Sequence, residues 1–228
     1  MNRKHQFVAI LLPAVLILGL PERSPSQEVR NIKPGKTYSS PLKDFKVPAP
    51  ELCLGTKIQQ EHDRNGGMVA FLSDVGQLER IDFERLDPSA VSALARADAA
   101  EKLAMYTEHL NSSVIRPNEA TLLVEGPFEL EEMEALFAVA EFPGGGVLEK
   151  AEFRDGKMVL ERVDSVRGLM VFSRGDIIYV LHHEVGTDFE QIWSCGLEGQ
   201  GGSGLTEEER NRVAREGLAN LHASLRFE

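Results

Sequence analysis

The sequence of 228 residues contains only two cysteines, Cys53 and Cys195, and one tryptophan. Neither cysteine belongs to a C-x-x-C pair and no basic cluster flanks either one, which argues against redox or nucleophilic thiol chemistry. Positive charge is also scarce, since 25 Lys and Arg residues against 36 Asp and Glu residues give a net charge of −11. This charge repels phosphate backbones and anionic lipid surfaces, so we expect no nucleic-acid partner.

The sequence also lacks a typical transmembrane segment. The apolar run over residues 7–20 would reach about 21 Å as a helix, short of the roughly 30 Å hydrocarbon layer, and Pro13 interrupts it. Basic residues precede the run and polar residues follow it, which is the layout of a secretory signal. Two serines before Gln27 suit a signal peptidase, so residues 1–26 are predicted to be a cleaved signal peptide.

This leader predicts a secreted or periplasmic protein with no stable membrane insertion once the signal is removed. No cysteine directly follows the apolar run, so a lipid anchor has no acceptor. An uncleaved leader would instead make the chain a membrane-anchored envelope structural protein. In an oxidising compartment Cys53 and Cys195 can form one disulfide, and the alternative is two separate buried thiols.

Ordinary contents of 42% hydrophobic and 27% charged residues predict a folded chain. Residues 27–36 are polar and without periodicity, which predicts a flexible lead, and residues 37–228 are predicted to form a single domain. The Asn65-Gly66 dipeptide is typical of a tight hairpin turn. The early strands are expected at residues 37–40, 44–47, 56–63, 67–73 and 78–86.

A long helix is predicted after residue 87. Asp87 suits the N-cap and Pro88 the first helical position, and an apolar stripe from Val91 to Leu110 follows at spacings of three and four. This pattern predicts one helix of about 23 residues that buries the stripe and exposes Lys102. Its members are Val91, Ala95, Ala99, Leu103, Tyr106 and Leu110.

The second half of the chain reads mainly as strands. Residues 128–142 fit helical spacing, yet the segment ends in Pro143 and three glycines, which favours a strand over residues 136–142. Thr206 and Glu209 form a capping box that opens a closing helix, which should bury Ala214, Leu218, Leu221 and Leu225. Extended segments are expected at residues 113–116, 120–125, 147–153, 158–163, 168–172 and 177–181.

These elements predict an α+β fold: a mostly antiparallel β-sheet in one domain, with two main helices packed on it. The order of hairpin, long helix, meander and closing helix, with the ending Ser224, Leu225, Arg226 and Phe227, resembles the Mog1/PsbP-like α/β/α sandwich over roughly residues 36–227. This resemblance implies a non-catalytic accessory or binding protein outside the cytoplasm. It transfers no site residue, because no functional motif of the group is matched.

A glycine-rich motif precedes the closing helix. Gly199, Gly201 and Gly204 spell G-x-G-x-x-G, but too few residues follow for a dinucleotide-binding βαβ unit, and three glutamates at the helix start would repel phosphate. Ser203 lacks the glycine at position 205 that a nucleophile elbow requires. A plain loop is the favoured interpretation.

His182, His183 and Glu184 cluster at the end of a strand, and a metal site could also recruit His109 or His62. Consecutive side chains on a strand point to opposite faces, so one histidine is expected to face the core and the other water. No metal or other cofactor is therefore predicted. The acidic residues Glu129, Glu131, Glu132 and Glu134 lack the spacing of a calcium loop and are expected to coat a solvated edge, while Phe189 and Trp193 are expected to pack on the sheet.

The sequence thus favours an exported, soluble, non-enzymatic protein that binds a protein partner or a small ligand. A hydrolase or metalloenzyme with a site assembled from distant residues is the alternative, and its first suspects are His109, His182, His183 and Glu184. The membrane-anchored structural protein is the third class. No residue is assigned a catalytic, cofactor-binding or metal-binding role.

Overall fold

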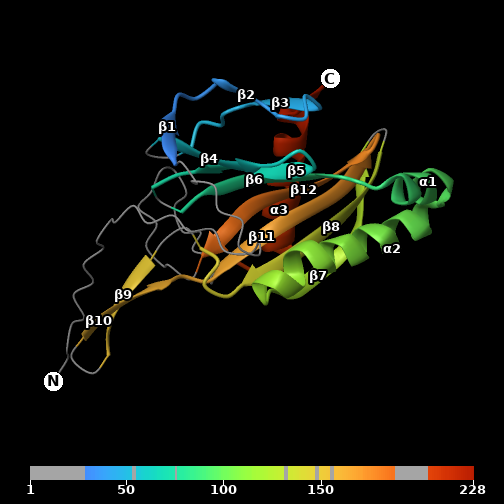
Figure 1. Ribbon diagram of the computed structural model, residues 1–228. Coiled ribbons are helices and arrows are strands. Elements are labelled where there is room, and N and C mark those ends of the chain that lie inside the picture. Colours follow the sequence, from blue (N-terminus) through green and yellow to red (C-terminus); the bar gives the residue numbers. More distant parts are fainter. Residues whose placement is uncertain are drawn as a thin grey trace.

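The computed structural model describes residues 29–52, 55–74, 76–130, 133–146, 149–154, 157–187 and 205–228. Its centre is an eight-stranded antiparallel sheet with the order β1-β4-β5-β6-β12-β11-β8-β7 (Figure 1). The α+β prediction is confirmed. The strands are β1 (Arg30–Ile32), β4 (Thr56–His62), β5 (Gly66–Leu72), β6 (Leu78–Arg85), β7 (Thr121–Leu130), β8 (Met133–Phe142), β11 (Ser165–Arg174) and β12 (Ile177–Thr187).

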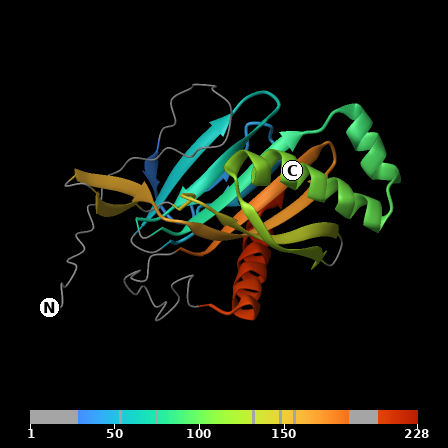
Figure 2. The ribbon, with the colours of Figure 1, turned by 90° about the horizontal axis from the view of Figure 1, so that it is seen from below.

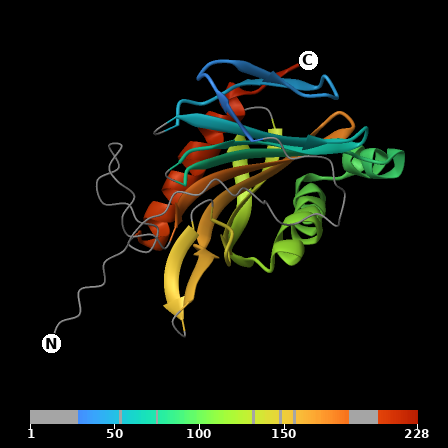
Figure 3. The ribbon, with the colours of Figure 1, turned by 60° about the vertical axis from the view of Figure 1, so that its left-hand side comes forward.

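Helices cover both faces of this sheet, with α2 (Ala99–Leu110) on one side and α3 (Glu207–Ser224) on the other (Figure 3). Because side chains alternate along a strand, β12 contributes to two apolar clusters. Ile178 and Val180 belong to the cluster under α2, whereas Tyr179 and Leu181 belong to the cluster under α3. We call these the α2 face and the α3 face of the sheet.

A small three-stranded sheet lies beside α3 and extends the core on that face (Figure 1). Phe45 packs edge-on against Tyr179 at a centroid distance of 6.0 Å, and the Tyr179 hydroxyl donates a 2.6 Å hydrogen bond to Asp44 Oδ2. The C-terminal strand pairs with its central strand, so the chain end is held in the fold. The three strands are β2 (Thr37–Ser39), β3 (Phe45–Pro48) and β13 (Arg226–Phe227).

Two strands stand apart from both sheets. β9 (Glu149–Arg154) and β10 (Lys157–Arg162) form their own antiparallel pair, which projects from the body of the molecule (Figures 1 and 3). In the described part of the chain neither strand pairs with any other.

The predicted 23-residue helix is wrong at one point. The chain forms two helices, α1 (Pro88–Arg96) and α2, because Ala97 is extended and Asp98 starts a new helix. Asp98 and Glu101 form a capping box, in which each side chain accepts a hydrogen bond from the other's backbone N–H. Figure 2 shows the change of direction between the two helices.

Other local expectations also change. Residues 113–116 are not extended, because α2 continues as a π-helical turn, Asn111–Ile115, and a 3-10 turn, Arg116–Asn118. Arg30–Ile32, placed in the flexible lead, instead pair with β4 as β1. The strand favoured for residues 136–142 is confirmed as part of β8, and the capping box of α3 is present.

Several predictions lie outside the described residues. They concern the signal peptide over residues 1–26, both cysteines of the disulfide hypothesis, the glycine-rich motif with Ser203, and Phe189 with Trp193. Among the residues that are described, no helix is both long and apolar enough to cross a membrane.

Candidate ligand-binding pocket

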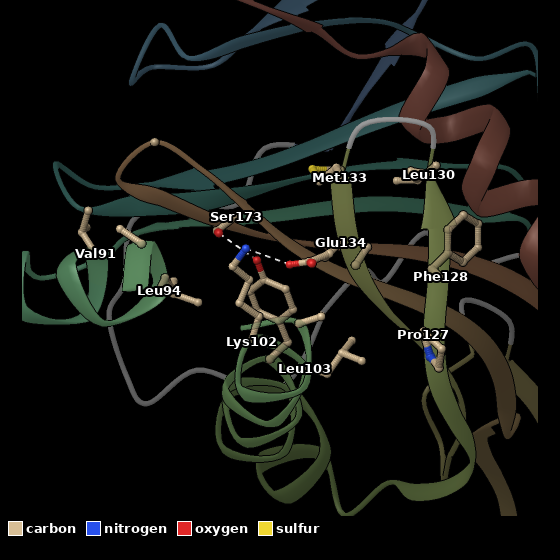
Figure 4. Close-up of a pocket in the computed structure, with 15 residues that line it drawn as sticks. Val91, Leu94, Lys102, Leu103, Pro127, Phe128, Leu130, Met133, Glu134 and Ser173 are labelled. Atoms are coloured by element: carbon tan, nitrogen blue, oxygen red, sulfur yellow. Dashed lines mark hydrogen bonds and ion pairs between the residues drawn. The ribbon is translucent and has the colours of Figure 1, made fainter. Parts of the chain in front are cut away.

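A pocket of about 730 Å³ lies between the α1–α2 pair and the β7–β8 hairpin (Figure 4). This volume falls within the range of about 300–1,000 Å³ that is typical of small-molecule sites. Most of the residues that line it are apolar, and they come from both helices and both strands of the hairpin. The apolar lining comprises Val91, Leu94, Ala95, Ala99, Leu103, Pro127, Phe128, Leu130, Met133 and Ala135.

Two polar pairs lie among these apolar walls. At the more buried side, the Tyr106 hydroxyl and Ser173 Oγ are 2.8 Å apart and share a hydrogen bond. At the more exposed side, Lys102 Nζ lies 2.8 Å from Glu134 Oε2 (Figure 4). The hydrogen bond to Glu134 raises the pKa of Lys102, so Lys102 is charged at neutral pH. The pocket can therefore offer hydroxyl groups inside and a neutralised ion pair near solvent.

The helix break at Ala97 creates the open part of this pocket. The apolar stripe predicted to be buried is divided there: Tyr106 and Leu110 are buried, but Ala95 and Ala99 beside the break are exposed. An apolar stripe that leaves small residues uncovered beside a cavity provides room for a ligand. The sequence signal for this site is the capping pattern of Asp98 and Glu101, which interrupts the stripe that predicts one continuous helix.

A second group of polar residues lies on the α2 face at the middle of the sheet. Asp82 accepts hydrogen bonds from Arg80 Nε at Oδ1, and its Oδ2 lies 2.8 Å from His182 Nε2. One strand further, Arg167 Nε lies 3.1 Å from Glu184 Oε2. Both partners of this second pair are more than nine-tenths buried, so each charge depends on the other for stabilisation.

Burial sets the protonation of this group. It lowers the pKa of His182 to about 4, and the nearby carboxylate of Asp82 offsets this only in part. Burial also raises the pKa of Asp82, but Arg80 and His182 overcome that effect and hold the pKa well below its usual range. At neutral pH, His182 is therefore an uncharged imidazole hydrogen-bonded to a carboxylate.

The four sequence suspects are only partly brought together. His182 and Glu184 lie on the α2 face, and His109 of α2 lies near enough to Asp82 and Glu84 for their charges to act on it, although burial lowers its pKa. His183 points to the opposite face. No group of three or more His, Cys, Asp or Glu side chains within the described ranges is arranged to hold a metal ion.

One of the two histidines was expected to face water, but His183 packs between the sheet and α3. Its Nδ1 lies 2.8 Å from Glu79 Oε1, and its ring packs against Gly217 of α3. Burial lowers the pKa of His183, but the hydrogen bond and charge of Glu79 raise it by more. His183 thus belongs to the contact between helix and sheet.

Comparison with known proteins gives similarity of structure alone. No family model matches the chain, and no curated protein does. The solution structure of cyanobacterial PsbP (CyanoP) from Synechocystis sp. PCC 6803 is similar, with 9% identity, 92% of this chain and 99% of that chain covered, and a TM-score of 0.43. A crystal structure of a protein from Bacteroides thetaiotaomicron is 12% identical and has a TM-score of 0.37. The match covers 86% of this chain and 49% of that chain.

One of these two structures is a PsbP, the group that the order of elements in the sequence resembles. Neither similar structure supplies a function or a site residue for this chain.

Proposed function

We propose that the protein is an exported, non-enzymatic binding module that holds a small, largely apolar ligand in the pocket between α1–α2 and the β7–β8 hairpin. The observation that carries the proposal is a pocket of ligand size that is lined mainly by apolar residues, with two polar pairs among them. Binding sites for small molecules combine these features: a concave apolar surface gives affinity, and a few placed polar groups fix orientation.

The polar pairs suggest the chemistry of the ligand. The hydroxyls of Tyr106 and Ser173 lie on the buried side, where they can hydrogen-bond one carbonyl or hydroxyl group of a ligand. Lys102 and Glu134 neutralise each other, so the pocket favours no net ligand charge. A neutral molecule with an apolar body and one oxygen-bearing group fits this arrangement.

Export is the second part of the proposal and rests on residues 1–26. A basic start, a short apolar run and a polar exit are the three parts of a secretory signal. Intact-mass measurement of the protein from its host tests this directly. A mature chain that begins at Gln27 is expected, whereas an intact leader recovered in the membrane fraction would support the anchored alternative.

The binding proposal can be tested by filling the pocket without disturbing the core. Ala99 and Ala100 are neighbouring exposed residues of α2, and only Ala99 lines the pocket. Ala99→Trp should weaken binding of the neutral apolar dye Nile red by about tenfold, because the indole occupies ligand space. Ala100→Trp is the matched control and should bind like the wild type.

Native mass spectrometry of protein isolated from its host identifies the physiological ligand. An apolar molecule that is retained by the wild type and by Ala100→Trp, but lost from Ala99→Trp, is the expected result. Equal dye affinity for the two tryptophan variants would place the binding surface elsewhere and overturn the proposal.

A further inference from the structure

The projecting β9–β10 hairpin carries two large apolar side chains that are partly exposed. Met158 and Leu160 are 50% and 39% exposed, and both lie on β10 two positions apart, hence on the same side of the strand. In register they stand opposite Phe153 and Ala151 of β9. A two-stranded sheet is marginally stable by itself in water, so this hairpin is a candidate for an intermolecular contact.

The outer side of β10 is also an unpaired strand edge. In the described residues β10 pairs with β9 alone, which leaves its second row of backbone N–H and C=O groups without a strand partner. Such edges are templates for pairing with another chain, and proteins commonly protect them with charged side chains, proline or bulges. β10 has neither a proline nor a register shift along its six residues.

The sequence of β10 complements itself in one antiparallel register. If Val159 faces Val159 of a second copy, Lys157 stands opposite the partner's Glu161, and Met158 opposite the partner's Leu160. Opposite charges in facing positions stabilise a strand pair, and both such contacts occur twice by symmetry. A slip by one residue would instead oppose Lys157 to the partner's Arg162 and Met158 to the partner's Glu161.

We propose that two copies of this chain associate through β10, forming an intermolecular four-stranded antiparallel sheet in the order β9-β10-β10-β9. Met158 and Leu160 of both copies then share one face, which covers the exposed apolar surface. The contact is small compared with stable dimer interfaces, so the dimer dissociates in the range of about 10 µM to 1 mM. The proposal is independent of the α1–α2 pocket.

The test is sedimentation equilibrium of the full mature chain over that concentration range. Lys157→Glu should raise the dimer dissociation constant by at least about tenfold, because it places two glutamates opposite each other in both contacts. The same change is favourable within the hairpin, where Lys157 stands opposite Arg154. Loss of the dimer therefore cannot be attributed to loss of the hairpin.

Charge complementation identifies the register. Glu161→Lys should also fail to form homodimers, since it opposes two lysines. An equimolar mixture of Lys157→Glu and Glu161→Lys chains should associate, because residue 157 of each copy then faces an opposite charge at residue 161 of the other. A monomeric wild type throughout the range, a dimer unaffected by Lys157→Glu, or a mixture that stays monomeric would each overturn the proposal.

Discussion

Gly217 of α3 and His183 of β12 occupy one tight contact between helix and sheet. A Cβ atom added to Gly217 would overlap the imidazole ring of His183, whose Nδ1 is hydrogen-bonded to Glu79. The glycine in the middle of a helix is therefore required by packing, despite its cost of roughly 1 kcal/mol in helix propensity. It lets α3 approach β12 closely enough to cover the histidine.

From this contact we expect Gly217→Ala to destabilise the protein by about 1–3 kcal/mol, although alanine is the better helix former. Chemical denaturation of the variant and the wild type measures the effect. The double variant Gly217→Ala/His183→Ala should recover part of the loss, because the smaller side chain leaves room for the added methyl group. No recovery would mean that α3 is displaced by some other contact.

His182 should make the protein sensitive to mild acid. Its folded pKa of about 4 lies below the ordinary value of 6.5, so between these values the unfolded chain binds a proton that the folded chain does not. Stability is therefore fully present above pH 6.5 and falls as the pH drops toward 4, by roughly 1.4 kcal/mol for each tenfold difference in proton affinity.

Denaturation midpoints measured from pH 7.5 to pH 4 test this expectation. His182→Gln, whose amide can still hydrogen-bond Asp82, should show a shallower loss of stability over that range. The contribution of His183 to the pH dependence of stability has the opposite sign. Its raised folded pKa adds stability below pH 6.5 that is lost as the pH rises. His183→Gln should therefore make the loss of stability toward acid steeper. Identical profiles of stability against pH for His182→Gln and His183→Gln would contradict both pKa assignments.

Most of the longer strands and the closing helix could be predicted from the sequence because their signals are local. Asn65-Gly66 places a turn between β4 and β5, and Thr206 with Glu209 begins α3 where expected. The break between α1 and α2 was also encoded locally, in Asp98 and Glu101, but the continuous apolar stripe concealed it. The pocket depends on this break, so it could not be predicted once the break was missed.

The buried charges could not be predicted because their partners are distant in sequence. His182 was recognised as a residue of interest, but nothing near it indicates that Asp82, a hundred positions earlier, would be its hydrogen-bond partner. Arg167 and Glu184 are instead paired by the register of the β11–β12 hairpin, and the register shift begins only beyond them, where Val166 lies opposite Gly186. Strand order, which periodicity does not specify, decides the pairing of His182 with Asp82.

Arg167 and Glu184 should be strongly coupled. Both are buried, and Arg167 also donates to the Gly145 carbonyl and stacks over Phe142 at 4.7 Å. Arg167→Met should cost about 3–5 kcal/mol, because it leaves a buried carboxylate without its partner.

Removing both charges separates this pairing effect from a loss of packing. Arg167→Met/Glu184→Leu should be more stable than Arg167→Met alone, because no unpaired carboxylate remains. The control is Arg212→Met, which breaks the exposed ion pair with Glu216 in α3 and should cost less than about 1 kcal/mol. Urea denaturation of the four chains compares them, and equal losses for the two arginine variants would contradict the burial argument.

The described strands also make the predicted disulfide testable. Cys53 precedes β4 by three positions and Cys195 follows β12 by eight, and the antiparallel order places the start of β4 and the end of β12 at the same end of the sheet. Three strand spacings are about 14 Å, whereas eight extended residues span up to about 27 Å. A bridge between Cys53 and Cys195 thus stays a hypothesis beside the alternative of two separate thiols, and reduction of such a bridge would lower stability by up to about 5 kcal/mol. Mass spectrometry after alkylation under denaturing, non-reducing conditions measures the thiols. Two alkylated cysteines in protein taken from its native compartment would show that the bridge does not form, and Cys53→Ser should then match the wild type in stability.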